Sequence, residues 1–184
     1  MGVSKMAAKK KEIKAGKKRK LLLVLRVLLL TAAFLYLFFF FYNNNFADNK
    51  VKIYFSSVDA NYLKFEERVL DESNDFYFQL FKELKAGPEN KELRETIPEE
   101  SKLLGYQLEE KVLTLNFSLE LRNNHWGGST GETMTIYSIV NTYTSLDEIE
   151  SVKILLEGEE VETLVGHLDL TQPLMYNQKL TVGN

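Results

Sequence analysis

The sequence predicts an α+β protein in which a single N-terminal transmembrane helix precedes a two-layer sandwich of a small mixed sheet and two helices. Residues 21–42 form a continuous apolar run directly after a stretch with nine lysines and arginines. Beyond this run, the hydrophobic pattern switches between periods of two and 3.6, which is typical of strands mixed with helices. The remaining 142 residues are enough for one compact domain.

The apolar run has the length of a membrane span. As a helix, residues 21–41 would rise about 1.5 Å each and cover roughly 30 Å, the thickness of the bilayer's hydrocarbon core. The basic residues before it predict a cytoplasmic N-terminus by the positive-inside rule. We therefore expect a basic cytoplasmic tail (1–20), a transmembrane signal anchor (21–42), a linker (43–49) and an extracytoplasmic domain (50–184).

A cleaved signal peptide is the alternative interpretation of the same segment. The apolar stretch of a signal peptide covers about 7 to 15 residues and ends at small residues. This run is longer and ends in FFFFYNNNF. The sequence therefore favours an uncleaved anchor that crosses the lipid bilayer once.

Charge and cysteine content narrow the functions of the exported part. Beyond residue 42 there are 13 basic and 25 acidic residues, a formal net charge of −12. This sign opposes binding to a phosphate backbone, so nucleic acid is not an expected partner. The chain has no cysteine, which excludes disulfides, thiol nucleophiles and thiolate metal sites.

The first half of the domain predicts two strands and a helix. Alternating apolar residues predict strands at 51–55 and 63–70. Ser73 is a plausible helix N-cap, and Gly87-Pro88 is the expected end of that helix. Its apolar face follows helical spacing and consists of Phe76, Tyr77, Leu80, Phe81 and Leu84.

The next segment predicts a charged connector at 89–100 and then an antiparallel hairpin with one buried face. In each strand of this hairpin, leucine and aromatic residues alternate with polar or small residues. The apolar positions are Leu104, Tyr106 and Leu108 in the first strand, and Leu113, Leu115, Phe117 and Leu119 in the second.

A second helix is predicted after two glycines. Ser129 and Glu132 have the spacing of a capping box, in which both side chains satisfy free amides at the helix start. The helix then carries too many apolar residues for a narrow stripe, so we expect it to lie deep: Met134, Ile136, Tyr137, Ile139, Val140 and Tyr143. VKILLEG and EEVETLVG predict two last strands around Gly158, which completes the α+β order.

An ordered series of motifs resembles the GerM domain of sporulation and spore germination proteins over about residues 50–176. The motifs are IYFSS from Ile53, the strand containing Val69, FKELKAGP ending at Pro88, ETIPEESKLLGYQLEEKVLTLNFS, GGSTGE from Gly127, IVNTYTSL from Ile139, VKILLEGEEV from Val152 and LDLTQPL from Leu168. GerM domains often occur twice per chain or behind a lipoprotein signal, whereas here one copy follows a signal anchor.

The resemblance implies a non-enzymatic, extracytoplasmic domain found mainly in endospore-forming bacteria. The fold it implies is similar to the ring-building motif of secretion and sporulation channels, in which helices pack on one face of a small sheet and neighbouring subunits associate edge to face. By analogy, the protein would be a membrane-tethered scaffold at the cell surface or between mother cell and forespore.

The residues themselves predict no catalytic, cofactor or metal site. His125 and His167 are far apart in sequence and lack the H-x-x-x-H or H-E-x-x-H context of a zinc site. Ser129 fits a cap better than a nucleophile, because G-x-S-x-G is absent. The paired acids are expected on the solvated surface, and Glu67 alone shares strand parity with apolar residues.

The candidate ligand or partner loop is His125, Trp126, Gly127 and Gly128, which holds the only tryptophan and a glycine pair before a helix. A carboxylate or a sugar ring could bind there. The sequence favours the other interpretation, that Trp126 plugs the end of the core while the glycines permit the turn.

The leading hypothesis is therefore a non-catalytic assembly module that associates with itself or with other envelope proteins during sporulation. An alternative is a cell-wall hydrolase, or an accessory protein that binds peptidoglycan. A further alternative is a receptor-like sensor whose ligand site is the loop at Trp126.

Overall fold

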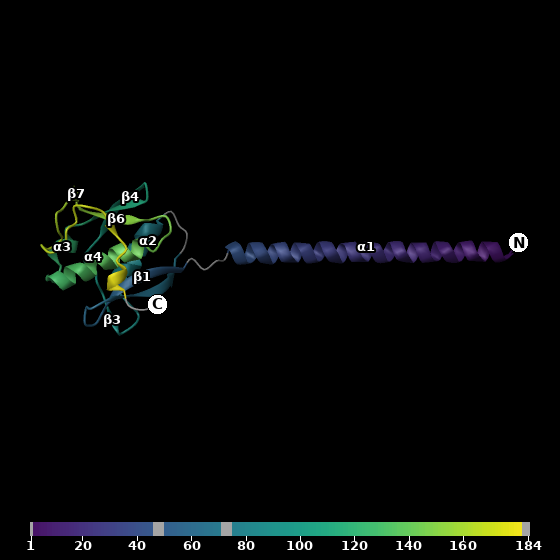
Figure 1. Ribbon diagram of the computed structural model, residues 1–184, viewed down its shortest axis with the longest axis horizontal. Helices are drawn as coiled ribbons and strands as arrows, with labels where there is room; N and C mark the ends of the chain where they lie inside the picture. Colours follow the sequence, from purple (N-terminus) through teal and green to yellow (C-terminus); the bar gives the residue numbers. More distant parts are fainter. Residues whose placement is uncertain (1, 46–49, 71–74, 182–184) are drawn as a thin grey trace. The chain divides into compact units, whose positions relative to one another are not determined.

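The chain consists of two units, Met1–Ala47 and Asp48–Asn184, which are described separately. The computed structural model describes residues 2–45, 50–70 and 75–181. Figure 1 shows its helices and strands.

The first unit is one helix, α1 (Gly2–Asn45). Its stretch Lys17–Phe40 is unburied, and by length and composition it could cross a membrane. The helix extends beyond both ends of the predicted 21–42 span. On the N-terminal side the sequence contains no proline and is rich in helix-favouring lysine and alanine, and on the C-terminal side the helix continues through three asparagines to Asn45. Residues 43–45 of the predicted linker are therefore helical, and 46–49 lie outside the described residues.

A three-stranded sheet opens the second unit. It has the order β2-β1-β3, formed by β1 (Lys50–Ser57), β2 (Leu63–Val69) and β3 (Leu93–Arg94). The first two strands are those predicted from the alternating pattern, and they pair antiparallel. The short β3 lies within the predicted charged connector and was not expected.

Helix α2 (Phe76–Ala86) follows β2 and ends at Gly87, as predicted. Leu80, Phe81 and Leu84 are buried on its inner face. Its N-cap residue is Asp75, and the predicted cap Ser73 lies outside the described residues.

The second sheet has the order β4-β5-β6-β7, with β8 also paired to β6. Its strands are β4 (Leu103–Glu109), β5 (Val112–Phe117), β6 (Ser151–Leu156), β7 (Glu159–Glu160) and β8 (Leu174–Met175). The predicted hairpin is β4–β5, while β5 and β6 are parallel, so the sheet is mixed.

The predicted buried face of this hairpin is correct for β5 and wrong for β4. Leu104, Tyr106 and Leu108 are 45%, 37% and 38% exposed. Strand β4 is an edge strand of the sheet. Helix α2 contacts it at Tyr106, whose ring centroid lies 4.8 Å from that of Tyr77 and 5.5 Å from that of Phe78.

Beyond β5, Leu119 is the exposed N-cap of the short helix α3 (Glu120–Asn123). It is therefore not a strand residue, in contrast to the prediction.

Helix α4 (Ser129–Tyr143) lies deep, as predicted. It contacts β1 of the first sheet and β6 and β8 of the second, and Figure 1 shows it passing between β1 and β6. Its Thr142 hydroxyl accepts a hydrogen bond from the Tyr54 amide of β1 at 2.9 Å. Ile136, Ile139 and Tyr143 are fully buried, so both sheets depend on this helix for their core.

The α+β class, the mixed pairing and the two packed helices are confirmed, but the strands are divided between two sheets. One reason is visible at β1, which pairs with β2 along one edge. Its other contacts are with β3, at Ser56 and Ser57, and with the Thr142 hydroxyl of α4, which accepts a hydrogen bond from the Tyr54 amide. These contacts take the place of pairing between β1 and a strand of the second sheet. The predicted last strand EEVETLVG is also short, because β7 covers Glu159–Glu160 alone. The segment after it ends in a short 3-10 helix, η1 (Gln178–Leu180).

Candidate functional site

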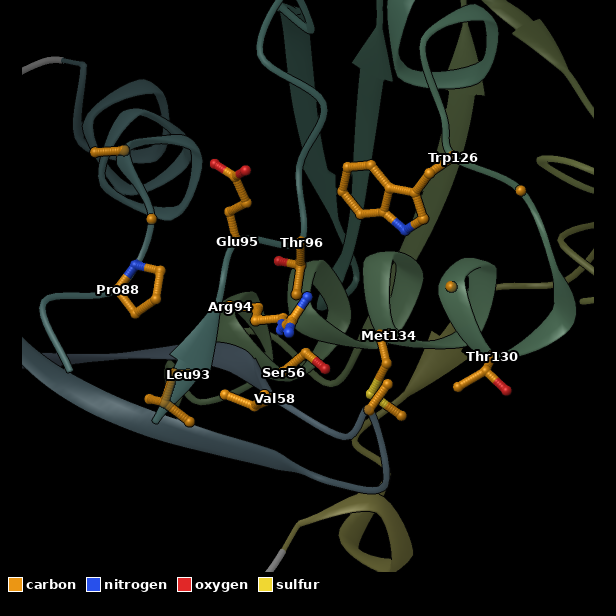
Figure 2. Close-up of a pocket in the computed structure, with 15 residues that line it drawn as sticks. Ser56, Val58, Pro88, Leu93, Arg94, Glu95, Thr96, Trp126, Thr130 and Met134 are labelled. Atoms are coloured by element: carbon orange, nitrogen blue, oxygen red, sulfur yellow. The ribbon is translucent and has the colours of Figure 1, made fainter. Parts of the chain in front are cut away.

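A cleft of about 740 Å³ lies beside the predicted loop, and we call it the Trp126 cleft. Four parts of the chain form its walls: the end of β1, the end of α2, the segment through β3, and the loop that enters α4. The lining residues are Ser56, Val58, Ala60, Ala86, Gly87, Pro88, Leu93, Arg94, Glu95, Thr96, Trp126, Gly127, Thr130, Gly131 and Met134. Figure 2 shows Trp126 on one side, with Glu95 and Pro88 on the other.

Trp126 is a wall of this cleft and does not plug the core. Its side chain is 55% exposed, so the interpretation favoured by the sequence is wrong. The indole stacks on the His125 ring, with centroids 5.1 Å apart. Gly131 of α4 permits this position, because a Cβ there would lie 3.0 Å from the indole Nε1.

His125 connects the loop to α4 through a chain of hydrogen bonds. The Gly127 amide donates to Nδ1 at 2.8 Å, so we assign the ring proton to Nε2, which donates to the Thr135 hydroxyl at 3.1 Å. That hydroxyl donates to the Thr96 carbonyl at 2.7 Å. Burial lowers the pKa of His125, against the opposing influence of the Glu132 carboxylate.

The two glycines make the turn from this loop into the helix. Gly127 and Gly128 both have φ of 79°, in the left-handed region that side chains rarely adopt. Gly128 is the N-cap of α4, and its carbonyl accepts the Glu132 amide at 3.0 Å. The helix therefore begins at Ser129, within the segment where a helix start was predicted.

The predicted capping box is wrong. Ser129 is the first helical residue rather than the cap, and no side-chain hydrogen bond caps this helix. Glu132 is fully buried, and its carboxylate accepts the amides of Leu164, Val165 and His167 at 2.8 to 2.9 Å. These bonds hold the segment after β7 in an irregular conformation, which explains why that segment is not a strand.

The sequence contained a signal for this burial. Glu132 precedes Ile136, Ile139 and Tyr143 by four, seven and eleven residues, which is the spacing of one helix face. An acid on an apolar face is expected to be buried with partners.

The wall opposite Trp126 carries polar groups that the sequence analysis did not single out. Arg94 and Glu95 are exposed, and no ion pair or hydrogen bond holds either side chain within the described ranges. Thr96 is 1% exposed, and its hydroxyl is buried with no hydrogen-bond partner among the described residues. Figure 2 shows Thr96 between Glu95 and Trp126.

The acid singled out by strand parity, Glu67, is not the buried one. It is half exposed and forms an ion pair with Lys50 at 3.6 Å. Its neighbour Glu66 binds Arg68 at 2.5 Å and accepts the amides of residues 89 and 90. Although burial opposes them, these bonds lower the pKa of Glu66, so this acid holds the connector to β2.

The second histidine, His167, does not line the cleft. His167 is exposed and donates its amide to Glu132. In the part of the chain that the structure describes, no three His, Asp or Glu side chains lie close enough to hold a metal ion.

A second surface feature lies on the edge of the larger sheet. Leu104, Tyr106 and Leu108 of β4, together with Phe78 of α2, are 37% to 45% exposed. We call these four residues the β4 apolar strip. Such a strip on a terminal strand is typical of an interaction surface.

Solved structures with a similar fold include the three that follow. One, of a protein described as a lipoprotein from Clostridium perfringens, is 25% identical, with a TM-score of 0.51 over 73% of this chain and 93% of that one. The tandem GerMN domains of the sporulation protein GerM from Bacillus subtilis are 18% identical, with a TM-score of 0.57 over 72% of this chain. The first GerMN domain of that protein is 20% identical, with a TM-score of 0.54 over 70% of this chain and 98% of that one.

The chain spans about half the length, 47%, of the tandem GerMN structure. No curated protein matches it in sequence. A family model does: Germane, described as sporulation and spore germination, matches residues 43–162. The resemblance to GerM drawn from the motifs is therefore confirmed, and the chain belongs to the Germane family of sporulation and spore germination domains.

Proposed function

We propose that this protein is a membrane-tethered, non-catalytic assembly module of the sporulation or germination apparatus. Helix α1 would anchor it, with the N-terminus in the cytoplasm and the Germane domain outside. The nine basic residues before the apolar run support this orientation. The similarity to a protein described as a lipoprotein supports a domain held at a membrane surface.

The observation that carries the assembly role is the β4 apolar strip. Exposed apolar side chains on a terminal strand favour association, because pairing would bury them and also satisfy free backbone groups. The partner in this proposal is a second copy of the domain or another envelope protein. The family's place in sporulation supports the same role.

Light scattering on the purified domain, residues 43–184, tests self-association. We expect its average mass to rise with concentration, and Leu104→Lys/Leu108→Lys to return it to the monomer, because two charges would then oppose burial of the strip. Leu119→Lys is the matched control, since Leu119 is 41% exposed outside the strip. A domain that stays monomeric, together with no envelope partner captured by crosslinking in sporulating cells, would contradict the proposal.

Peptidoglycan binding is the second candidate function, and the exposed indole in the Trp126 cleft favours it. Co-sedimentation of the chain with purified peptidoglycan tests binding, and release of soluble fragments tests for hydrolysis. We expect co-sedimentation without release. If neither occurs, this second function is rejected.

A further inference from the structure

We propose that the Trp126 cleft binds a sugar ring of a glycan strand, stacked on the indole and hydrogen-bonded by Arg94, Glu95 and the Thr96 hydroxyl. This inference rests on the second candidate function, peptidoglycan binding, and does not depend on the assembly role.

The first argument is the exposed indole. Trp126 is the only tryptophan of the chain, and more than half of its side chain is exposed although it stacks on His125. A large apolar ring in that position has a free face, and the C–H face of a sugar ring is flat and apolar enough to cover it. The cleft volume of about 740 Å³ is within the range of small-ligand sites.

The second argument is the pairing of donors and acceptors on the opposite wall. Arg94 offers guanidinium donors and Glu95 offers carboxylate acceptors, yet the described residues leave both side chains without an ion pair. A hydroxyl both donates and accepts hydrogen bonds. A polyhydroxyl ligand therefore satisfies both groups, whereas a simple anion would be attracted by Arg94 and repelled by Glu95.

The third argument is the Thr96 hydroxyl. It lies at the inner wall of the cleft and has no partner among the described residues, although buried polar groups are almost always hydrogen-bonded. The Thr96 carbonyl is already bound by Thr135, so the backbone position is fixed. A ligand hydroxyl that reaches this wall would supply the missing partner.

The position of Trp126 is also fixed. The His125 ring on which it stacks is held by Gly127 and Thr135, and Gly131 leaves room for the indole against α4. The stacking wall is therefore formed before any ligand arrives, which reduces the entropy lost on binding.

The test is a titration of the full-length chain in detergent micelles, followed through the emission of its single tryptophan. The probes are chitotetraose, an oligosaccharide of N-acetylglucosamine, and glycan strands from amidase-treated peptidoglycan. We expect a saturable emission change with both. If neither probe gives one, or if sodium acetate gives the same change and competes, the cleft is not a sugar site.

Four variants locate the binding site. Their binding is measured by co-sedimentation with peptidoglycan, because Trp126→Ala removes the tryptophan whose emission reports binding in the titration. Trp126→Ala should abolish binding to glycan strands. Gly131→Ala should weaken it, because the new Cβ would displace the indole that remains. Thr96→Val keeps the side-chain shape and should weaken binding about fivefold to tenfold, the size of one net hydrogen bond. Ser101→Ala is its control, since Ser101 also has a buried unpartnered hydroxyl but does not line the cleft.

The variants also separate this inference from the two functions above. If the chain binds peptidoglycan but Trp126→Ala, Gly131→Ala and Thr96→Val bind as tightly as the parent, the sugar subsite is wrong while the second function stands. Leu104→Lys/Leu108→Lys should leave glycan binding unchanged, because the β4 apolar strip lies outside the cleft.

Discussion

At the scale of single residues, Glu132 is a buried polar group on which the fold depends. Its carboxylate accepts three backbone amides, and it is fully buried. In Glu132→Gln, one oxygen becomes an amide donor that faces an amide donor, so we expect the free energy of unfolding to fall by about 2 kcal/mol. Urea denaturation measures it.

The control for that prediction is Glu67→Gln, at a half-exposed carboxylate with one long ion pair. This change should alter the free energy of unfolding by less than about 0.5 kcal/mol. If Glu132→Gln is as stable as this control, the structural role assigned to Glu132 is incorrect.

His125 should make stability depend on pH. Burial lowers the pKa of its ring below the ordinary value of 6.5, so the unfolded chain binds more protons in the interval below 6.5. The contribution of His125 is therefore complete above pH 6.5 and is lost as the pH falls from there through the lowered pKa of the folded state. Urea denaturation of the parent and of His125→Gln over about pH 7.5 to 5.5 tests this. Equal losses in both proteins would show that His125 is not responsible.

The hydrogen-bond partners of Glu132 and Glu66 could not be identified from sequence because they lie in distant parts of the chain. Glu132 fits a capping box by spacing alone, and the amides that bind it come from residues 164–167, over thirty positions later. Strand parity pointed to Glu67, but the connector at residues 89 and 90 binds Glu66 instead. The loop at His125–Gly128 stays a prediction as a ligand or partner site, and the structure places its Trp126 and Gly127 in the wall of a cleft.

At the scale of elements, the β4–β5 turn is a site for stabilisation. Glu110 and Lys111 have φ of 46° and 67°, a left-handed conformation that favours Asn-Gly in two-residue hairpin turns. Glu110→Asn/Lys111→Gly should raise the free energy of unfolding by about 1 kcal/mol, because it relieves this strain. Thermal or urea denaturation measures the change.

Lys91→Gly is the comparison for that turn, because Lys91 is exposed and is not among the residues with positive φ. There, glycine should lower stability by roughly 0.5 kcal/mol through backbone entropy. A hairpin variant that loses stability in the same way would contradict the strain argument.

The pattern of apolar residues located the longer helices and strands well, but it did not predict what packs against each of them. Periodicity located β1, β2, α2, the β4–β5 hairpin and α4, because each has enough residues to show a period. The two-residue strands β3, β7 and β8 are too short for any period. The exposure of β4 could not be predicted either, since alternation shows that one face is apolar but not what covers it.

At the scale of the whole molecule, the apolar pattern predicted the α+β class and the order of the longer elements, whereas the division of the strands into two sheets depends on tertiary contacts. Helix α4 packs between β1 and β6 and is buried on nearly all sides. In the sequence, the signal for strands on more than one side of this helix was that its apolar residues are too many for a single narrow face. The separation of charge was readable directly: a basic N-terminal segment, an apolar run and an acidic domain.

We propose that the Germane domain lies outside the membrane and remains attached through α1, and one labelling experiment tests both parts. The chain has no cysteine, so one introduced cysteine is the only thiol of this chain that a membrane-impermeant maleimide can label. Asp147→Cys, at an exposed position of the domain, should be labelled in intact cells on a full-length chain. Ser4→Cys, in the basic tail, should be labelled only after permeabilisation. If Asp147→Cys is protected in intact cells and labelled only once they are permeabilised, the domain is not exported and the claim is wrong.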